Sequence, residues 1–98
     1  MPYEIILEPD AVDHLRSFSA RDRATVLDEV EEQLTYEPEV ETRHRKRLRP
    51  NPLAPWELCI GNLGVFYDVY EEPAGVRVVA VGRKRGNTLI IAGQEISL

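Results

Sequence analysis

Residues 56–85 read WELCIGNLGVFYDVYEEPAGVRVVAVGRKR, and this stretch decides the fold. Trp56 and Leu58 alternate with other residues, as side chains do in a strand that buries one face. The segments 65–70 and 76–81 are rich in aromatic and β-branched residues, which favour strands. Glycine, asparagine and proline between the segments indicate short turns. The stretch therefore predicts three strands joined as an antiparallel meander.

Two helices are expected on the N-terminal side of the meander. Residues 3–8 alternate as a short strand, and Pro9 and Asp10 favour a helix start directly after it. Residues 19–22, SARD, resemble a capping box that opens a second helix. Apolar residues follow each start at helical spacing: Ala11, Val12, Leu15 and Phe18, then Val26, Leu27, Val30 and Leu34. So short a joint predicts an antiparallel helical hairpin.

The order of these elements defines the expected fold class. Residues 35–55 hold four of the seven prolines, so this segment is expected to connect the second helix to the meander. Residues 89–91 favour a further short strand. The expected architecture is α+β in the order β-α-α-β-β-β, with a helical hairpin packed on a small antiparallel sheet. A length of 98 residues fits a single domain over positions 1–98.

Charge is distributed unevenly along the chain. The formal net charge is −5, yet residues 1–42 carry twelve acidic and three basic residues, and residues 43–98 carry five acidic and nine basic ones. The acidic total argues against a nucleic-acid ligand, because such ligands attract basic surfaces. The excess of basic residues in positions 43–98 means that the net charge alone does not exclude a nucleic-acid ligand.

The composition excludes several other classes of protein. The single cysteine, Cys59, excludes an internal disulfide and gives no support to a thiolate metal cluster. His14 and His44 lack the spacing of a metal-binding pair, so neither a metal nor a cofactor is expected. No apolar run approaches the roughly 20 residues that span a bilayer, so no membrane partner is expected. The expected compartment is the reducing cytoplasm.

Two basic clusters flank the meander. The first contains Arg43, Arg45, Lys46, Arg47 and Arg49, and the second contains Arg83, Lys84 and Arg85. A sheet brings the end of one strand near the start of another, so the clusters are expected to converge on one surface. Guanidinium groups bind phosphate oxygens in bidentate fashion, and such a surface suits a polyanion. The alternative is a solvated loop, or pairing with the protein's own acidic helix.

Glu57 and Phe66 are the candidate residues inside the meander. Glu57 alternates away from Trp56, so it is expected to point off the core face, where its carboxylate suits a general base toward a ribose hydroxyl. A structural ion pair is the alternative for Glu57. Phe66 is expected to face a partner and to stack on a base. Trp56 and Tyr67 are expected in the core.

The chain resembles the RelE/ParE superfamily of bacterial toxins over nearly its whole length. The resemblance rests on the order and spacing of four segments: 47–49 (RLR), 56–58 (WEL), 65–69 (VFYDV) and 80–85 (AVGRKR). It implies a small toxin that a cognate antitoxin neutralises. RelE-like members enter the ribosomal A site and cleave messenger RNA by metal-independent attack of the ribose 2′-hydroxyl on the adjacent phosphate. ParE-like members instead inhibit DNA gyrase.

The two basic clusters and the resemblance together give a candidate site. The expected catalytic residues are Arg47, Arg49, Glu57, Arg83 and Lys84, and the expected nucleic-acid-binding residues are Arg43, Arg45, Lys46, Arg85 and Phe66. Three positions depart from the family pattern: Cys59 and Gly64 replace basic residues, and Ile90 replaces a tyrosine. Two functions therefore remain open. One is a ribosome-dependent endoribonuclease, and the other is a toxin without catalysis that binds gyrase or only its antitoxin.

Overall fold

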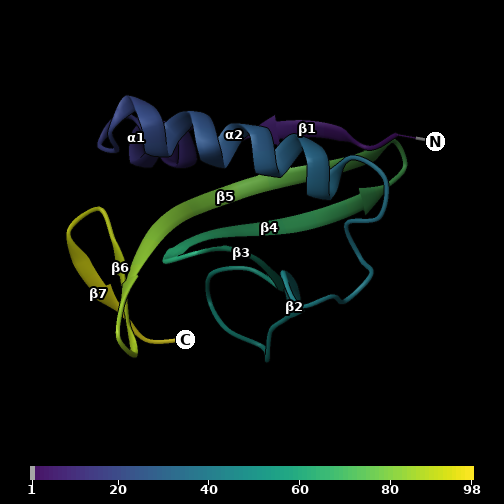
Figure 1. Ribbon diagram of the computed structural model, residues 1–98. Coiled ribbons are helices and arrows are strands. Elements are labelled where there is room, and N and C mark those ends of the chain that lie inside the picture. Colours follow the sequence, from purple (N-terminus) through teal and green to yellow (C-terminus); the bar gives the residue numbers. More distant parts are fainter. Residues whose placement is uncertain (1) are drawn as a thin grey trace.

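A computed structural model of the chain describes residues 2–98 as two helices lying on one face of a seven-stranded sheet (Figure 1). The elements are β1 (Glu4–Leu7), α1 (Pro9–Arg16), α2 (Ala20–Leu34), β2 (Arg45–Arg47), β3 (Trp56–Ile60), β4 (Leu63–Glu71), β5 (Ala74–Arg85), β6 (Thr88–Ile91) and β7 (Gln94–Ile96). This arrangement confirms the α+β class. It also confirms the expected order of one strand, two helices and three meander strands, which are β3, β4 and β5. No helix within residues 2–98 is both long and apolar enough to cross a membrane.

The sheet is ordered β2-β3-β4-β5-β6-β7, with neighbouring strands antiparallel. The exception is β1, which pairs in parallel with residues 75–78 of β5. Because β4 pairs along almost all of β5, β1 and β6 share the other edge of that strand. The long strand β5 is therefore the centre of the fold.

The meander strands are longer than the sequence pattern predicts. The expected turn over residues 61–64 is only two residues long, because Leu63 already pairs with Ile60 and Gly64 with Cys59. Gly61 has a φ of 58°, which glycine adopts without steric cost, and this allows so tight a turn. The third strand does not end at residue 81 but continues to Arg85. The second basic cluster consequently lies within a strand, and not after it.

Two further strands were not expected. The short strand β2 forms inside the proline-rich connection, where Arg45–Arg47 pairs with β3. The short strand β7 follows β6 across a two-residue turn. Each has only three residues, which is too short a stretch for periodicity to mark.

The start of α2 follows the predicted capping pattern. Ser19 is the N-cap, and its side-chain oxygen accepts a hydrogen bond from the backbone N–H of Asp22 at 3.1 Å. This bond satisfies one of the donors that every helix start leaves free. The antiparallel joint with α1 is thereby fixed within residues 17–19.

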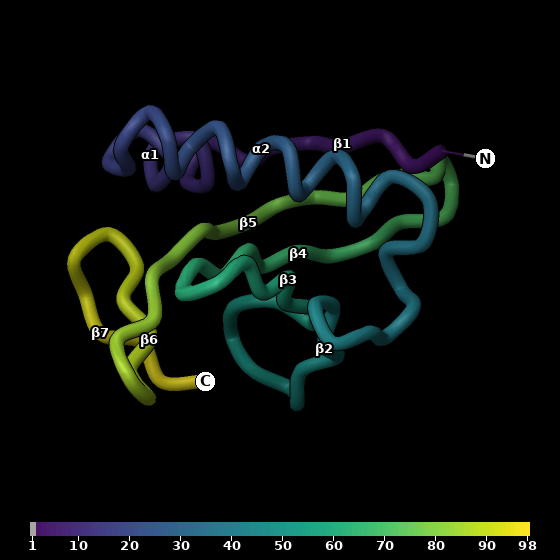
Figure 2. Tube along the Cα trace, viewed as in Figure 1, coloured from purple at the N-terminus to yellow at the C-terminus, as the bar shows by residue number. Residues whose placement is uncertain are grey.

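A hydrophobic core lies on each face of the sheet. The larger core packs α1 and α2 against the sheet and includes Trp56 and Tyr67, as expected. The smaller core lies on the opposite face, which we call the far face, and consists of Ala54, Phe66, Ala80, Leu89 and Ile91. The loop after β2 lies on this side of the sheet, away from the helices, whereas the turn between β6 and β7 reaches up beside α1 (Figure 2). Within residues 2–98, both helices lie on the other face, and no helix covers the far face.

Candidate functional site

The second basic cluster is divided between the two faces of the sheet. Successive side chains of a strand point to opposite faces, and residues 83–85 are consecutive in β5. Arg83 pairs across the ladder with Leu63, a member of the larger core, so Arg83 lies on the helix side. Lys84 lies on the far face, where it pairs with Leu89. The expectation that both clusters form one surface is therefore wrong.

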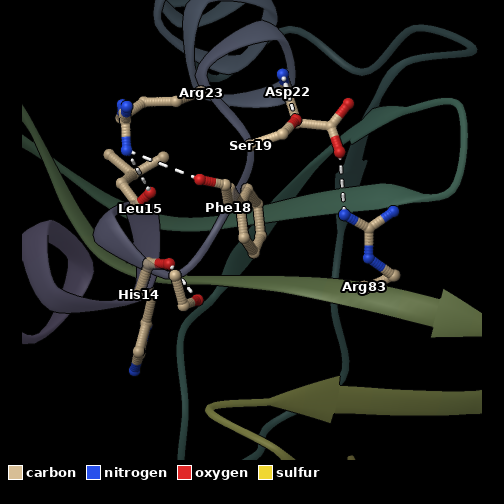
Figure 3. Close-up of polar contacts among 8 residues, drawn as sticks. His14, Leu15, Phe18, Ser19, Asp22, Arg23 and Arg83 are labelled. Atoms are coloured by element: carbon tan, nitrogen blue, oxygen red, sulfur yellow. Dashed lines mark hydrogen bonds and ion pairs between the residues drawn. The ribbon is translucent and has the colours of Figure 1, made fainter.

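Arg83 holds the helical joint to the sheet. Its Nη2 donates to Asp22 Oδ2 at 2.9 Å, and its guanidinium lies 5.4 Å from the ring of Phe18 (Figure 3). Both partners belong to the joint between α1 and α2 or to the first turn of α2. The predicted catalytic role of Arg83 conflicts with this position, since its charge is already paired on the helix side.

The first basic cluster is divided in the same way. Arg45 is buried, and its guanidinium donates to the carbonyl oxygens of Val40 at 2.7 Å and Gln33 at 2.8 Å. Arg47 lies 5.5 Å from the ring of Trp56. Arg45 is thus a structural residue that fastens the connection to the end of α2, and its predicted role in nucleic-acid binding is wrong.

The remaining arginines are exposed but scattered. Arg43 and Arg49 lie in the loops on either side of β2, and Arg85 lies at the exposed end of β5. Arg85 borders a small hollow that it shares with Arg83 on the helix side. The exposed arginines therefore belong to two regions, one beside β2, where Arg49 shares a hollow with Arg47, and one at the end of β5.

A compact group of polar side chains lies on the far face. Lys46 of β2 pairs across the ladder with Glu57 of β3. The carboxylate oxygen Oε2 of Glu57 lies 2.5 Å from Nζ of Lys84, and the same Nζ lies 3.6 Å from Sγ of Cys59. Three strands thus bring two lysines, one glutamate and one cysteine together, and we call this group the lysine–glutamate site.

Gly64 provides the space that this site needs. A Cβ atom built on Gly64 would lie 2.9 Å from Oε2 of Glu57, closer than such contacts occur. Glu57 is only 4% exposed, and its carboxylate fills the space beside Gly64. Glycine at position 64, where the family pattern has a basic residue, therefore leaves the space that the Glu57 carboxylate occupies.

Burial and neighbouring charges shift two pKa values in the site. Burial lowers the pKa of Lys84, but contact with Glu57 and its charge raise it, and the pKa lies above its ordinary value. Burial raises the pKa of Cys59, the charge of Glu57 raises it further, and Lys84 offsets only part of this shift. At neutral pH the lysine is therefore charged and the thiol is protonated.

A pocket of about 600 Å³ opens beside the site. Glu57 and Lys84 line one part of it, and the apolar residues Leu89 and Ile96 line another. Phe66 also borders the pocket but is fully buried. The expectation that Phe66 presents its ring to a base is therefore wrong, since the ring belongs to the smaller core.

Sequence reasoning missed Cys59 and Gly64 as parts of the site. Both were noted only as departures from a family pattern. The signal that marks Cys59 is its two-residue spacing from Glu57, which places both side chains on one face of β3. The signal for Gly64 is its register opposite Cys59, which only the pairing of β3 with β4 reveals.

Comparison with known proteins identifies the fold. The chain is similar to a chain in the crystal structure of the toxin–antitoxin complex RelBE2 from Mycobacterium tuberculosis, with a TM-score of 0.75 and 23% identity. The match covers 86% of this chain and 93% of that chain. No family model and no curated protein matches the sequence. The likeness confirms the RelE-like fold that the sequence resemblance implied.

Proposed function

We propose that this protein is the toxin of a type II toxin–antitoxin pair and that it cleaves messenger RNA on the ribosome. The fold shared with a chain of a toxin–antitoxin complex supports the first part. The second part rests on the lysine–glutamate site, where Glu57 and Lys84 meet at a pocket and Lys46 lies opposite Glu57 in the neighbouring strand. The same likeness supports a cognate antitoxin as partner. The cytoplasm is the proposed place of action, because the proposed target is the ribosome.

The proposed reaction is an internal transesterification of RNA. Glu57 accepts the proton of a ribose 2′-hydroxyl, whose oxygen forms a bond to the adjacent phosphorus. The bond from phosphorus to the 5′-oxygen of the next nucleotide breaks, which leaves a 2′,3′-cyclic phosphate and a 5′-hydroxyl end. Lys84 and Lys46 stabilise the charge that develops on the phosphate oxygens, and Lys84 supplies the proton that the leaving oxygen takes up.

This assignment revises the set of residues that the sequence pattern suggested. Glu57, Lys84 and Lys46 remain, and all three belong to the far face. Arg49 lies after β2 and contributes general attraction for the phosphate backbone. Arg47 pairs with Trp56 and lies over its ring, so it belongs to the helix side. Arg83 has no part in the proposed reaction, because Asp22 pairs with it on the helix side.

A toxin without catalysis is the second candidate. One observation favours it: the carboxylate of Glu57 is already paired with Lys84, as it would be in a purely structural contact. In that case the protein binds its target, gyrase or another, through its surface and leaves RNA intact.

Expression of the protein alone in a bacterium, followed by mapping of messenger RNA ends, tests the proposal. We expect growth arrest with new 5′ ends inside codons, and cleavage reduced about 100-fold or more in Glu57→Gln and Lys84→Gln. Arg16→Gln is the matched control, because it removes an exposed charge from α1. Growth arrest without new RNA ends contradicts the ribonuclease and supports the second candidate.

A further inference from the structure

The pairing of Glu57 with Lys84 places a carboxylate where an anionic ligand would bind. Lys84 is one of the two lysines of the site, which lies on the far face of the sheet, and its Nζ lies 2.5 Å from Oε2 of Glu57. A carboxylate and a phosphodiester offer a lysine the same kind of negatively charged oxygen. The protein's own side chain therefore occupies the position that the proposed reaction needs for a phosphate.

The environment of this carboxylate is unfavourable in two respects. Glu57 is 4% exposed, and a buried carboxylate loses the hydration that stabilises its charge. Within residues 2–98, Oε2 receives no hydrogen bond of regular geometry beside the ion pair. Moving the carboxylate out of this position restores its hydration, and this gain offsets part of the cost of breaking its contact with Lys84.

Gly64 leaves the space that the carboxylate occupies beside Lys84. The space above its Cα is occupied by Oε2, which a Cβ at position 64 would approach to 2.9 Å. The same Cβ would lie 3.4 Å from the Phe66 ring, an ordinary contact. A single methyl group at this position is therefore expected to displace the carboxylate without disturbing the smaller core.

We propose that the lysine–glutamate site is a phosphodiester-binding position which Glu57 occupies in the free protein, and that a phosphate of single-stranded RNA displaces Glu57 from Lys84 as it binds. The inference rests on the proposed function for the identity of the ligand. It adds that Glu57 competes with the substrate phosphate for Lys84 before it accepts a proton from the substrate. Displacement by the phosphate frees the carboxylate to accept a proton, so binding and activation are coupled.

The test is binding of a short single-stranded 2′-O-methyl RNA, which cannot undergo the reaction, measured by fluorescence anisotropy. Glu57→Gln removes the competing charge, and Gly64→Ala displaces it while the net charge is unchanged. Each variant is expected to bind about tenfold more tightly than the natural protein, because the lysine no longer carries a counter-charge. Adding Lys84→Gln to either variant is expected to abolish the gain.

Two matched controls separate this effect from simpler ones. Glu72→Gln removes an acidic charge from an exposed turn, and Gly75→Ala adds a methyl group where its nearest contact is an ordinary 3.5 Å. Both are expected to change affinity less than about twofold. If Glu57→Gln gains no more than Glu72→Gln, the inference is overturned, and this comparison holds even if Gly64→Ala fails to fold.

The binding assay and the cleavage assay fail independently. If the natural protein cuts no RNA but both variants bind RNA more tightly than it does, the phosphodiester position is supported and the ribonuclease is contradicted. Cleavage by the natural protein, without a gain in either variant, supports the ribonuclease and contradicts the displacement of Glu57.

Discussion

At the scale of single residues, the lysine–glutamate site brings together side chains that lie apart in the sequence. Glu57 is one of five acidic residues in the basic half of the chain, and Cys59 is two positions away from it. Their importance comes from Lys84, which contacts both. The departures at Cys59 and Gly64 are consistent with this site, since one contacts the lysine and the other leaves space for the carboxylate.

The pKa of the Cys59 thiol depends on the charges of its neighbours. Burial and Glu57 raise its pKa, so alkylation by iodoacetamide, which requires the thiolate, is expected to rise only above the ordinary pH range of a thiol. Glu57→Gln removes one cause of the shift and is expected to move the midpoint of the rate profile to lower pH. Lys46→Gln removes a charge that lowers the pKa and is expected to move the midpoint to higher pH.

The rate of Cys59 alkylation as a function of pH measures both shifts. Glu72→Gln, far from the thiol in an exposed turn, serves as the control for net charge. Identical midpoints in all variants would show that Glu57 and Lys46 do not act on Cys59, and would contradict the geometry of the site.

At the scale of elements, the length of β5 determines where the charges lie. Had the strand ended at residue 81, the three basic residues after it would occupy a loop and point in any direction. Because pairing continues through Arg83, Lys84 and Arg85, alternation assigns them to faces. The pairing partner is β6, and it approaches closely because Gly82 has no Cβ, which would lie 2.7 Å from Cγ1 of Ile91.

The β6–β7 turn contains a residue that does not suit its backbone. Ala92 has a φ of 52° and Gly93 a φ of 77°, so both central residues of this two-residue turn are left-handed. Asparagine followed by glycine is the preferred sequence for such a turn. Ala92→Asn is therefore expected to increase the free energy of unfolding by about 0.5–1 kcal/mol.

Urea denaturation measures this change. Gln94→Asn places the same residue two positions later, in the extended backbone of β7, and is expected to give no gain. A loss of stability in Ala92→Asn would contradict the left-handed turn.

At the scale of the whole molecule, the sheet separates two sets of charges. The helix side carries acidic α2 together with Arg83 and the buried Arg45, whose charges are used within the protein. The far face carries Lys46 and Lys84, of which Lys84 lines a pocket, and no helix within residues 2–98 covers it. The net charge of −5 is therefore a poor guide to the charge around Lys46 and Lys84, because the acidic residues are concentrated in the half of the chain that contains the helices.

Adjacent residues of one strand test this separation. Arg83→Gln and Lys84→Gln each remove one positive charge, but from opposite faces of β5. Affinity for single-stranded 2′-O-methyl RNA is expected to fall about tenfold in Lys84→Gln and less than about threefold in Arg83→Gln. Arg83→Gln is instead expected to cost up to about 1 kcal/mol of stability through the lost contact with Asp22.

Fluorescence anisotropy and urea denaturation of the two variants provide these measurements. Equal losses of affinity would mean that RNA responds only to the overall charge of the protein. That result would contradict a binding surface confined to the far face.

The sequence by itself determined the local structure of this protein. Alternation in residues 56–60, capping at Ser19 and short glycine turns predicted the strands, the helical hairpin and the fold class, because these depend on neighbours within a few positions. The same patterns placed Trp56 and Tyr67 in the core. They also directed Glu57 away from the helix side, which the structure confirms.

Only the tertiary structure decided which charges meet. Strand pairing beyond residue 81 divided Arg83 from Lys84, and contacts with α2 used Arg45 within the protein. The far-face core buried Phe66, which propensity alone left free to face a partner. These outcomes depend on register and on packing between distant segments, and a one-residue shift in the pairing register of a strand moves its side chains to the other face. The sequence named the charged residues, and the pairing of strands selected the few that form a site.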